Sequence, residues 1–193
     1  IEPTVQLTTL DIPGDGRIWI ASKATDLGGG TWQYEYAVYN HNSNLSVGGF
    51  SVPKAASVSA SSVGFHDVNY HSGEPYSGTD WTGVVNAGDV SWSTQTFAAN
   101  PNANAIRWST TYNFRFQANQ SPVLGSVALT RFKDGVVHNV GNTFVPGTPV
   151  ATGSCCITDG SCSVTTSAAC TGSWTNGGSC SPNICPAPTG ACC

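Results

Sequence analysis

The stretch WQYEYAVY at residues 32–39 decides the fold of this chain. Every second side chain in it is aromatic or branched and apolar, namely Trp32, Tyr34, Tyr36 and Val38. The residues between them are Gln33, Glu35, Ala37 and Tyr39. Because successive side chains of a β-strand point to opposite faces, this period of two predicts a strand with an aromatic row on a buried face.

The same alternation returns at residues 112–117, where the predicted buried row is Tyr112, Phe114 and Phe116. Shorter runs of the same kind occupy residues 17–24, 63–68, 89–94, 105–109 and 126–132. Turn signals separate the runs, among them Asp15-Gly16, Gly28-Gly29-Gly30 and Asp134-Gly135. About ten short strands at this spacing predict an all-β fold with a two-sheet β-sandwich or jelly-roll body.

The composition excludes several classes of protein. Charged residues make up 9% of the chain and its net charge is −4, so there is no basic face for a nucleic-acid backbone. No apolar run approaches the roughly 18 residues that a membrane span needs. Heptads of a coiled coil are also absent. We therefore expect neither nucleic-acid partners nor a membrane span.

All the cysteines lie in the last quarter of the chain. An even number at this density predicts a disulfide framework formed in an oxidising compartment. The predicted bridges use Cys155, Cys156, Cys162, Cys170, Cys180, Cys185, Cys192 and Cys193. The spacing leaves their pairing open. Zinc is the alternative, but it favours paired CxxC elements and the chain has none.

The composition also divides the chain into parts. We predict a β-sandwich body at residues 1–145, a linker rich in Pro and Gly at 146–154, and a Cys-rich module at 155–193. The element TGSCC at 152–156 returns as TGACC at 189–193, so the last two cysteines are expected to open a second unit. Because the chain has no Met and begins at Ile1, we expect that a signal peptide was removed and that the protein is secreted.

Three segments resemble a known group of sequences. They are YNHNSN at residues 39–44, GFHDVNYHSGEPYSGTDW at 64–81 and AIRWSTTYNFRF at 105–116. Together they resemble a recurrent domain of uncharacterised secreted bacterial proteins, which is often followed by Cys-rich repeats opening with Gly-x-Cys-Cys. The resemblance implies an extracellular or cell-surface location. It carries no known activity, and therefore no catalytic residue.

The loop at residues 64–81 collects polar side chains that suit a cation: His66, Asp67, His71, Glu74 and Asp80. Imidazole with carboxylate suits a transition metal, and carboxylate with backbone carbonyls suits calcium. No known ligand motif matches the spacing. We favour the alternative, in which hydrogen bonds of these side chains pin the loop and no cofactor is bound.

Catalysis is not expected. The chain has only three glutamates, Glu2, Glu35 and Glu74, and lacks the GxSxG element of many hydrolases. Its cysteines are assigned to bridges, which leaves no thiol nucleophile.

Exposed aromatic side chains are the stronger binding signal. Tyr70, Trp81 and Trp108 lie near predicted loops or strand ends, where they would stack on sugar rings. Strand parity instead assigns Trp19, Trp32 and Trp92 to the core. Asn44 and Asn119 match the N-glycosylation acceptor pattern. A secreted carbohydrate-binding or adhesion module is therefore the alternative function.

The N-terminal residues favour assembly as the main function. Alternation places Ile1, Pro3, Val5 and Leu7 on one side of a terminal strand. Such a strand completes its own sheet or adds to the open edge of another copy. The scarcity of charge leaves few residues that block pairing between copies. We hypothesise a non-catalytic extracellular structural subunit that self-assembles into a filament or surface layer through this strand and the Cys-rich tail.

Overall fold

The chain divides into two compact units, Ile1–Thr148 and Pro149–Cys193, which we call the body and the tail module. The computed structural model describes residues 4–69, 71, 73–148 and 152–186. The boundary falls within the predicted linker. The linker was predicted too long at its end, however, because strand β11 (Thr152–Cys156) already begins inside it.

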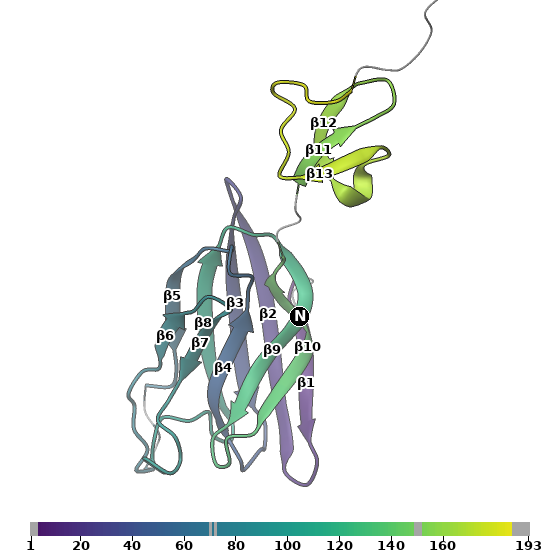
Figure 1. The fold of residues 1–193 in the computed structure, drawn as a ribbon. Helices are drawn as coiled ribbons and strands as arrows, with labels where there is room; N and C mark the ends of the chain where they lie inside the picture. The colour runs from purple at the N-terminus through teal and green to yellow at the C-terminus, as the bar shows by residue number, and fades with distance from the viewer. Residues whose placement is uncertain (1–3, 70, 72, 149–151, 187–193) are drawn as a thin grey trace, which may run out of the picture. The chain divides into compact units, whose positions relative to one another are not determined.

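The body is a sandwich of two antiparallel five-stranded sheets (Figure 1). Sheet A has the order β1 (Gln6–Ile12), β2 (Gly16–Gly28), β3 (Thr31–Asn40), β8 (Thr110–Ala118) and β5 (Ala60–His66). Sheet B has the order β10 (Val137–Pro146), β9 (Pro122–Arg131), β4 (Val47–Pro53), β7 (Asp89–Ser93) and β6 (Thr82–Val85). Strand β1 lies beside β10, and β5 lies beside β6. The predicted all-β, two-sheet fold is confirmed.

The alternating rows of β3 and β8 form the centre of the core. Their register places Tyr34 opposite Phe116 and Tyr36 opposite Phe114. The rings of Tyr34 and Phe116 stack with centroids 5.1 Å apart. Tyr36 meets Phe50 of β4 edge-on at 5.2 Å, which joins the two sheets. The buried aromatic row expected for residues 32–39 is therefore present.

Both core tyrosines satisfy their hydroxyl groups. Tyr34 donates to the carbonyl of Gln120 at 2.7 Å, and Tyr36 donates to that of Phe144 at 2.8 Å. Burial raises the pKa of both phenols, since it disfavours the phenolate. The two groups therefore remain hydrogen-bond donors at neutral pH.

Residues 105–109 do not form the strand predicted for them. Ala105 and Ile106 are fully buried, but the segment's only β-bridge among the described residues is the isolated one between Val47 and Ile106. Trp108 lies in a turn, and Ser109 has a φ of 57°. The apolar pattern reflects the burial of a connecting loop rather than pairing within a sheet.

Of the three tryptophans assigned to the core, one lies elsewhere and one is only partly buried. Trp92 is buried as expected, at 2% exposure. Trp19 instead belongs to the outer face of sheet A, because β2 turns Ile18 and Ile20 inward. Trp32 is partly buried and packs against the core cluster, as expected for its strand face.

The glycine run at the end of β2 forms a turn, as predicted. Gly28, Gly29 and Gly30 all have positive φ, between 60° and 82°. A residue with a side chain is strained at positive φ. Three successive positions with positive φ therefore favour glycine. The run allows β2 and β3 to pair as a long hairpin.

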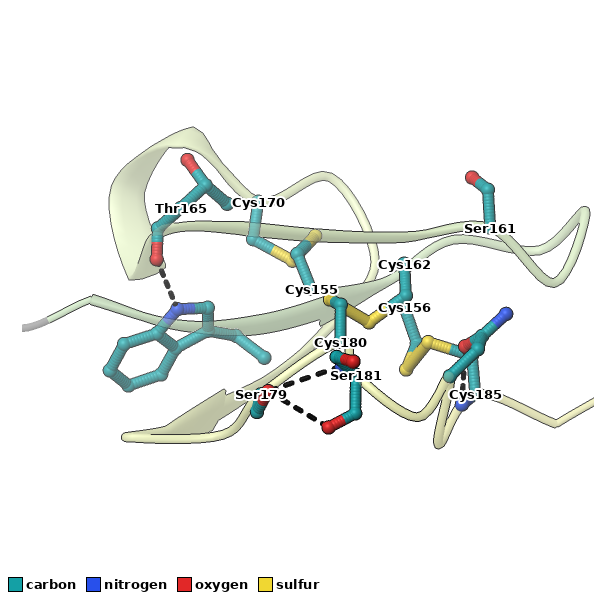
Figure 2. The surroundings of a disulfide bond; sticks show 12 residues. Cys155, Cys156, Ser161, Cys162, Thr165, Cys170, Ser179, Cys180, Ser181 and Cys185 are labelled. Atoms are coloured by element: carbon teal, nitrogen blue, oxygen red, sulfur yellow. Dashed lines mark hydrogen bonds between the residues drawn. A yellow bond between two sulfur atoms is a disulfide. The ribbon is translucent and has the colours of Figure 1, made fainter.

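The tail module is a small sheet in the order β12 (Cys162–Thr166), β11 and β13 (Ser173–Asn176), with a short 3-10 helix at Ser167–Ala169. Three disulfides cross it (Figure 2), pairing Cys155 with Cys170, Cys156 with Cys185, and Cys162 with Cys180. The expected six-cysteine unit is confirmed. Cys192 and Cys193 lie outside the described residues.

Candidate functional site

Four connections gather at one end of the body, the lower end in Figure 1. They are residues 41–46, 67–81, 94–109 and 132–136, which follow β3, β5, β7 and β9. Side chains join them: Lys133 Nζ donates to Asn44 Oδ1 at 2.9 Å, and the Arg107 guanidinium lies 3.5 Å above the ring of Tyr76. This loop end is built from segments that are far apart in the sequence.

Asn104 is the hub of the loop end. Its side chain is fully buried and accepts a hydrogen bond from the hydroxyl of Tyr112. Its Nδ2 donates to Asp67 and, at 2.9 Å, to the carbonyl of Thr79. The backbone carbonyl of Asn104 accepts from Trp81 Nε1 at 2.5 Å. One side-chain amide therefore pins both ends of the loop at residues 67–81, a role that no pattern in the sequence predicts.

The five residues proposed for a cation do not converge. Asp67 binds Asn104, and the buried His71 places its Nε2 3.4 Å from Asn104 Oδ1. His66, Glu74 and Asp80 are exposed. The carboxylate of Asp67 thus pins the loop through the side-chain amide of Asn104, and His71 is the buried histidine of the five residues.

Among the described residues, the one grouping of three metal-binding side chains is Cys156, Cys162 and Cys185, with sulfur atoms within 4.8 Å of one another. All three belong to disulfides, which removes the thiolates that a metal requires. The geometry therefore supports disulfides in the tail module and pinning in the loop. Calcium in the loop stays an untested prediction.

Replacing Asn104 with alanine is expected to loosen the loop. The change leaves the Asp67 carboxylate without its amide donor and should lower the free energy of unfolding by about 2–3 kcal/mol. Urea unfolding measures the loss, and hydrogen exchange should show faster exchange at residues 67–81. His66→Ala, at the exposed last residue of β5 next to the loop, should stay within about 0.5 kcal/mol of the parent. Equal losses in the two variants would contradict the hub role.

A polar recess of about 340 Å³ opens at the loop end, and we call it the apical hollow. Its lining includes Asn44, Glu74, Tyr76, Arg107, Trp108 and Lys133. Trp108 is 60% exposed, the highest value for a large hydrophobic side chain in the described structure. A flat, exposed indole beside charged and amide groups is a typical arrangement for stacking on a sugar.

Of the two described aromatic residues predicted to stack on glycans, Trp108 is placed to do so and Trp81 is not. Trp81 is 2% exposed, and its ring stacks on Phe65 with centroids 5.7 Å apart. Its prediction as a binding residue was wrong, because the loop folds the indole into the core. Tyr70 lies outside the described residues. Asn44 and Asn119, the predicted glycosylation acceptors, are both exposed.

The outer face of sheet A carries a second recess of about 410 Å³. Glu35 lines it and lies opposite both Lys23 and Arg115 in the strand register. Glu74 lines the apical hollow instead. The two glutamates therefore belong to separate recesses, and this arrangement does not provide a pair of carboxylates across one cleft.

No helix among the described residues is long and apolar enough to cross a membrane. In comparisons with known proteins, no family model, no curated protein and no solved structure matches the chain. The resemblance to a secreted bacterial domain therefore stays a prediction. The function must be inferred from the geometry alone.

Proposed function

We propose that this chain is a non-catalytic extracellular structural subunit that polymerises head to tail through the free edges of β1 and β6. The observation that carries the proposal is the difference between the four sheet edges of the body. A sheet edge presents unpaired N–H and C=O groups to which another chain can add a strand, unless a bulge, a charge or a covering segment prevents it. Two edges carry such protection, and two are regular.

The protected edges are β5 and β10. The register of β5 with β8 shifts between Ser61 and Gly64, and that of β10 with β9 shifts between Val140 and Thr143. Both bulges contain a residue of positive φ, Ser62 at 52° and Asn142 at 55°. Such bulges bend an edge strand and interrupt its outward hydrogen-bonding groups.

The edge of β10 is also covered from within the body. The backbone N–H of Phe144 donates to Ser22 Oγ at 3.0 Å, and its carbonyl accepts from Tyr36. Both partners belong to sheet A, so these two groups of β10 are occupied inside the molecule. This second protection leaves β10 a poor site for strand addition.

The regular edges are β1 and β6. Strand β1 pairs with β2 over seven residues and β6 pairs with β7 over four, both without a register shift. Residues 82–85 contain no charged side chain, and the one charged residue of β1, Asp11, pairs with Arg17 of the adjacent strand β2. Val84 and Val85 of β6 are 47% and 43% exposed. These edges therefore offer the backbone groups and apolar side chains that strand addition uses.

The placement of the two regular edges favours an open polymer. Strand β1 ends sheet A on the side of β10, whereas β6 ends sheet B on the side of β5 (Figure 1). Contact between two different surfaces of neighbouring subunits is heterologous. Repetition of such a contact builds an open polymer, unless the rotation that relates successive subunits closes a ring. Of the residues predicted for an assembly strand, Leu7 lies in β1 and Val5 precedes it; Ile1 and Pro3 lie outside the described residues.

The compartment proposed for this assembly is extracellular. The three disulfides of the tail module form and persist under oxidising conditions, which are found outside the cell. The low charge of the chain further limits repulsion between copies.

Lysines on β6 are expected to prevent assembly. In the double variant Val84→Lys/Val85→Lys, strand pairing would place ammonium groups in the new interface. The concentration at which polymers form should therefore rise at least about tenfold, which corresponds to a loss of about 1.4 kcal/mol in association free energy per contact. Sedimentation velocity and negative-stain microscopy of the full chain measure polymer content. Val137→Lys is the matched control, because it adds a lysine to β10 at a residue that is 56% exposed.

This control should assemble like the parent chain. A parent that remains monomeric across the concentration range would overturn the proposed function. Assembly lost equally in the control and in the β6 variant would show that added charge, and not the edge of β6, is responsible.

A second candidate function is the binding of extracellular glycans, and the exposed Trp108 favours it. The indole borders a recess that is large enough for a sugar ring and lined by amide and charged groups. The two functions are compatible, since the apical hollow lies at the loop end and the regular strand edges lie along the sides of the body.

A further inference from the structure

The apical hollow concentrates positive charge on a chain that is acidic as a whole. The net charge is −4, and the chain has only seven Lys and Arg residues. Two of them, Arg107 and Lys133, line this one recess with a single carboxylate, Glu74. Elsewhere Arg17 pairs with Asp11 and Arg131 pairs with Asp134. The hollow is therefore a local cationic site.

The guanidinium of Arg107 is held in place before any ligand binds. Its Nη2 donates to the carbonyls of Pro101 at 2.9 Å and Ala103 at 3.1 Å, and its plane covers the ring of Tyr76. Its Nε is buried and has no hydrogen-bond partner in the described part of the chain. A cation fixed in this way loses little conformational entropy when an anion binds.

The backbone around the hollow is strained. Ser46, which lines the recess, has a φ of 57°, and Ser109, next to Trp108, has the same value. These are two of the four non-glycine residues with positive φ among those described. Strained residues of this kind cluster at ligand-binding sites, where the fold holds side chains in a fixed geometry.

We infer that the apical hollow binds acidic glycans, with the sugar ring stacked on Trp108 and its carboxylate placed between Arg107 and Lys133. This inference rests on the second proposed function. The apolar face of a pyranose suits the indole, and a uronic acid carboxylate suits the two cations. Glu74 and the amide of Asn44 remain to bind hydroxyl groups of the sugar. A neutral sugar would leave the cationic pair unmatched.

The test compares three probes by isothermal titration calorimetry with the full chain: trigalacturonate, the neutral trisaccharide cellotriose, and the peptide triglutamate. We expect trigalacturonate to bind at least roughly tenfold more tightly than either of the others, since only it supplies both the sugar ring and the carboxylate. Its affinity should fall as salt is added, because screening weakens charge pairs near the surface.

Two variants and two matched controls locate the site. Trp108→Ala should weaken trigalacturonate binding at least about tenfold, and Lys133→Gln should weaken it several-fold while largely sparing cellotriose. Trp19→Ala and Arg115→Gln remove an aromatic ring and a cation from the outer face of sheet A and should change neither affinity. Circular dichroism confirms that each variant is folded.

The outcomes distinguish two claims: that the apical hollow binds glycans, and that it prefers acidic ones. Equal binding of trigalacturonate and cellotriose would leave glycan binding standing and overturn the acidic preference. Triglutamate binding as tightly as trigalacturonate would show a simple anion site and overturn the inference. Binding of neither sugar would overturn both claims. A loss of trigalacturonate affinity confined to the Trp19 and Arg115 variants would place the site on the outer face of sheet A and overturn the inference.

Discussion

Reduction of the disulfides is expected to unfold the tail module and to leave the body folded. In the described part of the tail module the only buried hydrophobic residue is Cys155, whereas Val164 and Ile184 are more than half exposed. So little apolar burial cannot offset the entropy of ordering the chain. Each bridge contributes about 2–4 kcal/mol, so the three together decide whether this module folds.

Hydrogen exchange of the full chain with and without dithiothreitol measures this effect. Amides of residues 152–186 should lose their protection on reduction, and the indole of Trp174, which donates to the Thr165 carbonyl at 2.9 Å, should become more exposed. The body serves as an internal control, since it contains no cysteine. Tail amides that stay protected after full reduction would contradict this account of its stability.

Phe114→Ala is expected to cause the largest loss of stability of any single substitution proposed for the body. The ring is 1% exposed and meets aromatic rings from both sheets, with centroids 4.7 Å from Phe50 of sheet B and 5.5 Å from Phe65 of sheet A. Truncation removes these contacts and leaves a cavity that the surrounding strands cannot close. The free energy of unfolding should fall by about 3–5 kcal/mol.

Urea unfolding followed by tryptophan fluorescence measures the change for Phe114→Ala. Val137→Ala provides the comparison, because that side chain is 56% exposed and its truncation should cost less than about 0.5 kcal/mol. A loss below about 1 kcal/mol for Phe114→Ala would show that the two sheets close around the missing ring.

The candidate site was only partly predictable from the sequence. Trp108 was identified because aromatic residues near loops are a local signal. Trp81 carried the same signal and is buried, because its indole donates to Asn104 and stacks on Phe65. Arg107 and Lys133 are separated by two strands, and no pattern in the chain shows that they line one recess.

The sequence by itself determined the all-β class, the aromatic core of β3 and β8, and the six-cysteine unit. These features depend on local order: side chains that alternate with a period of two, and cysteines too dense for any other use in an oxidising compartment. Only the tertiary structure decided which tryptophan is exposed, which sheet edges carry bulges, and how Asn104 holds Asp67 at a separation of 37 residues. Those features arise from contacts between distant segments, and the free energy of such contacts depends on packing that no short stretch of residues encodes.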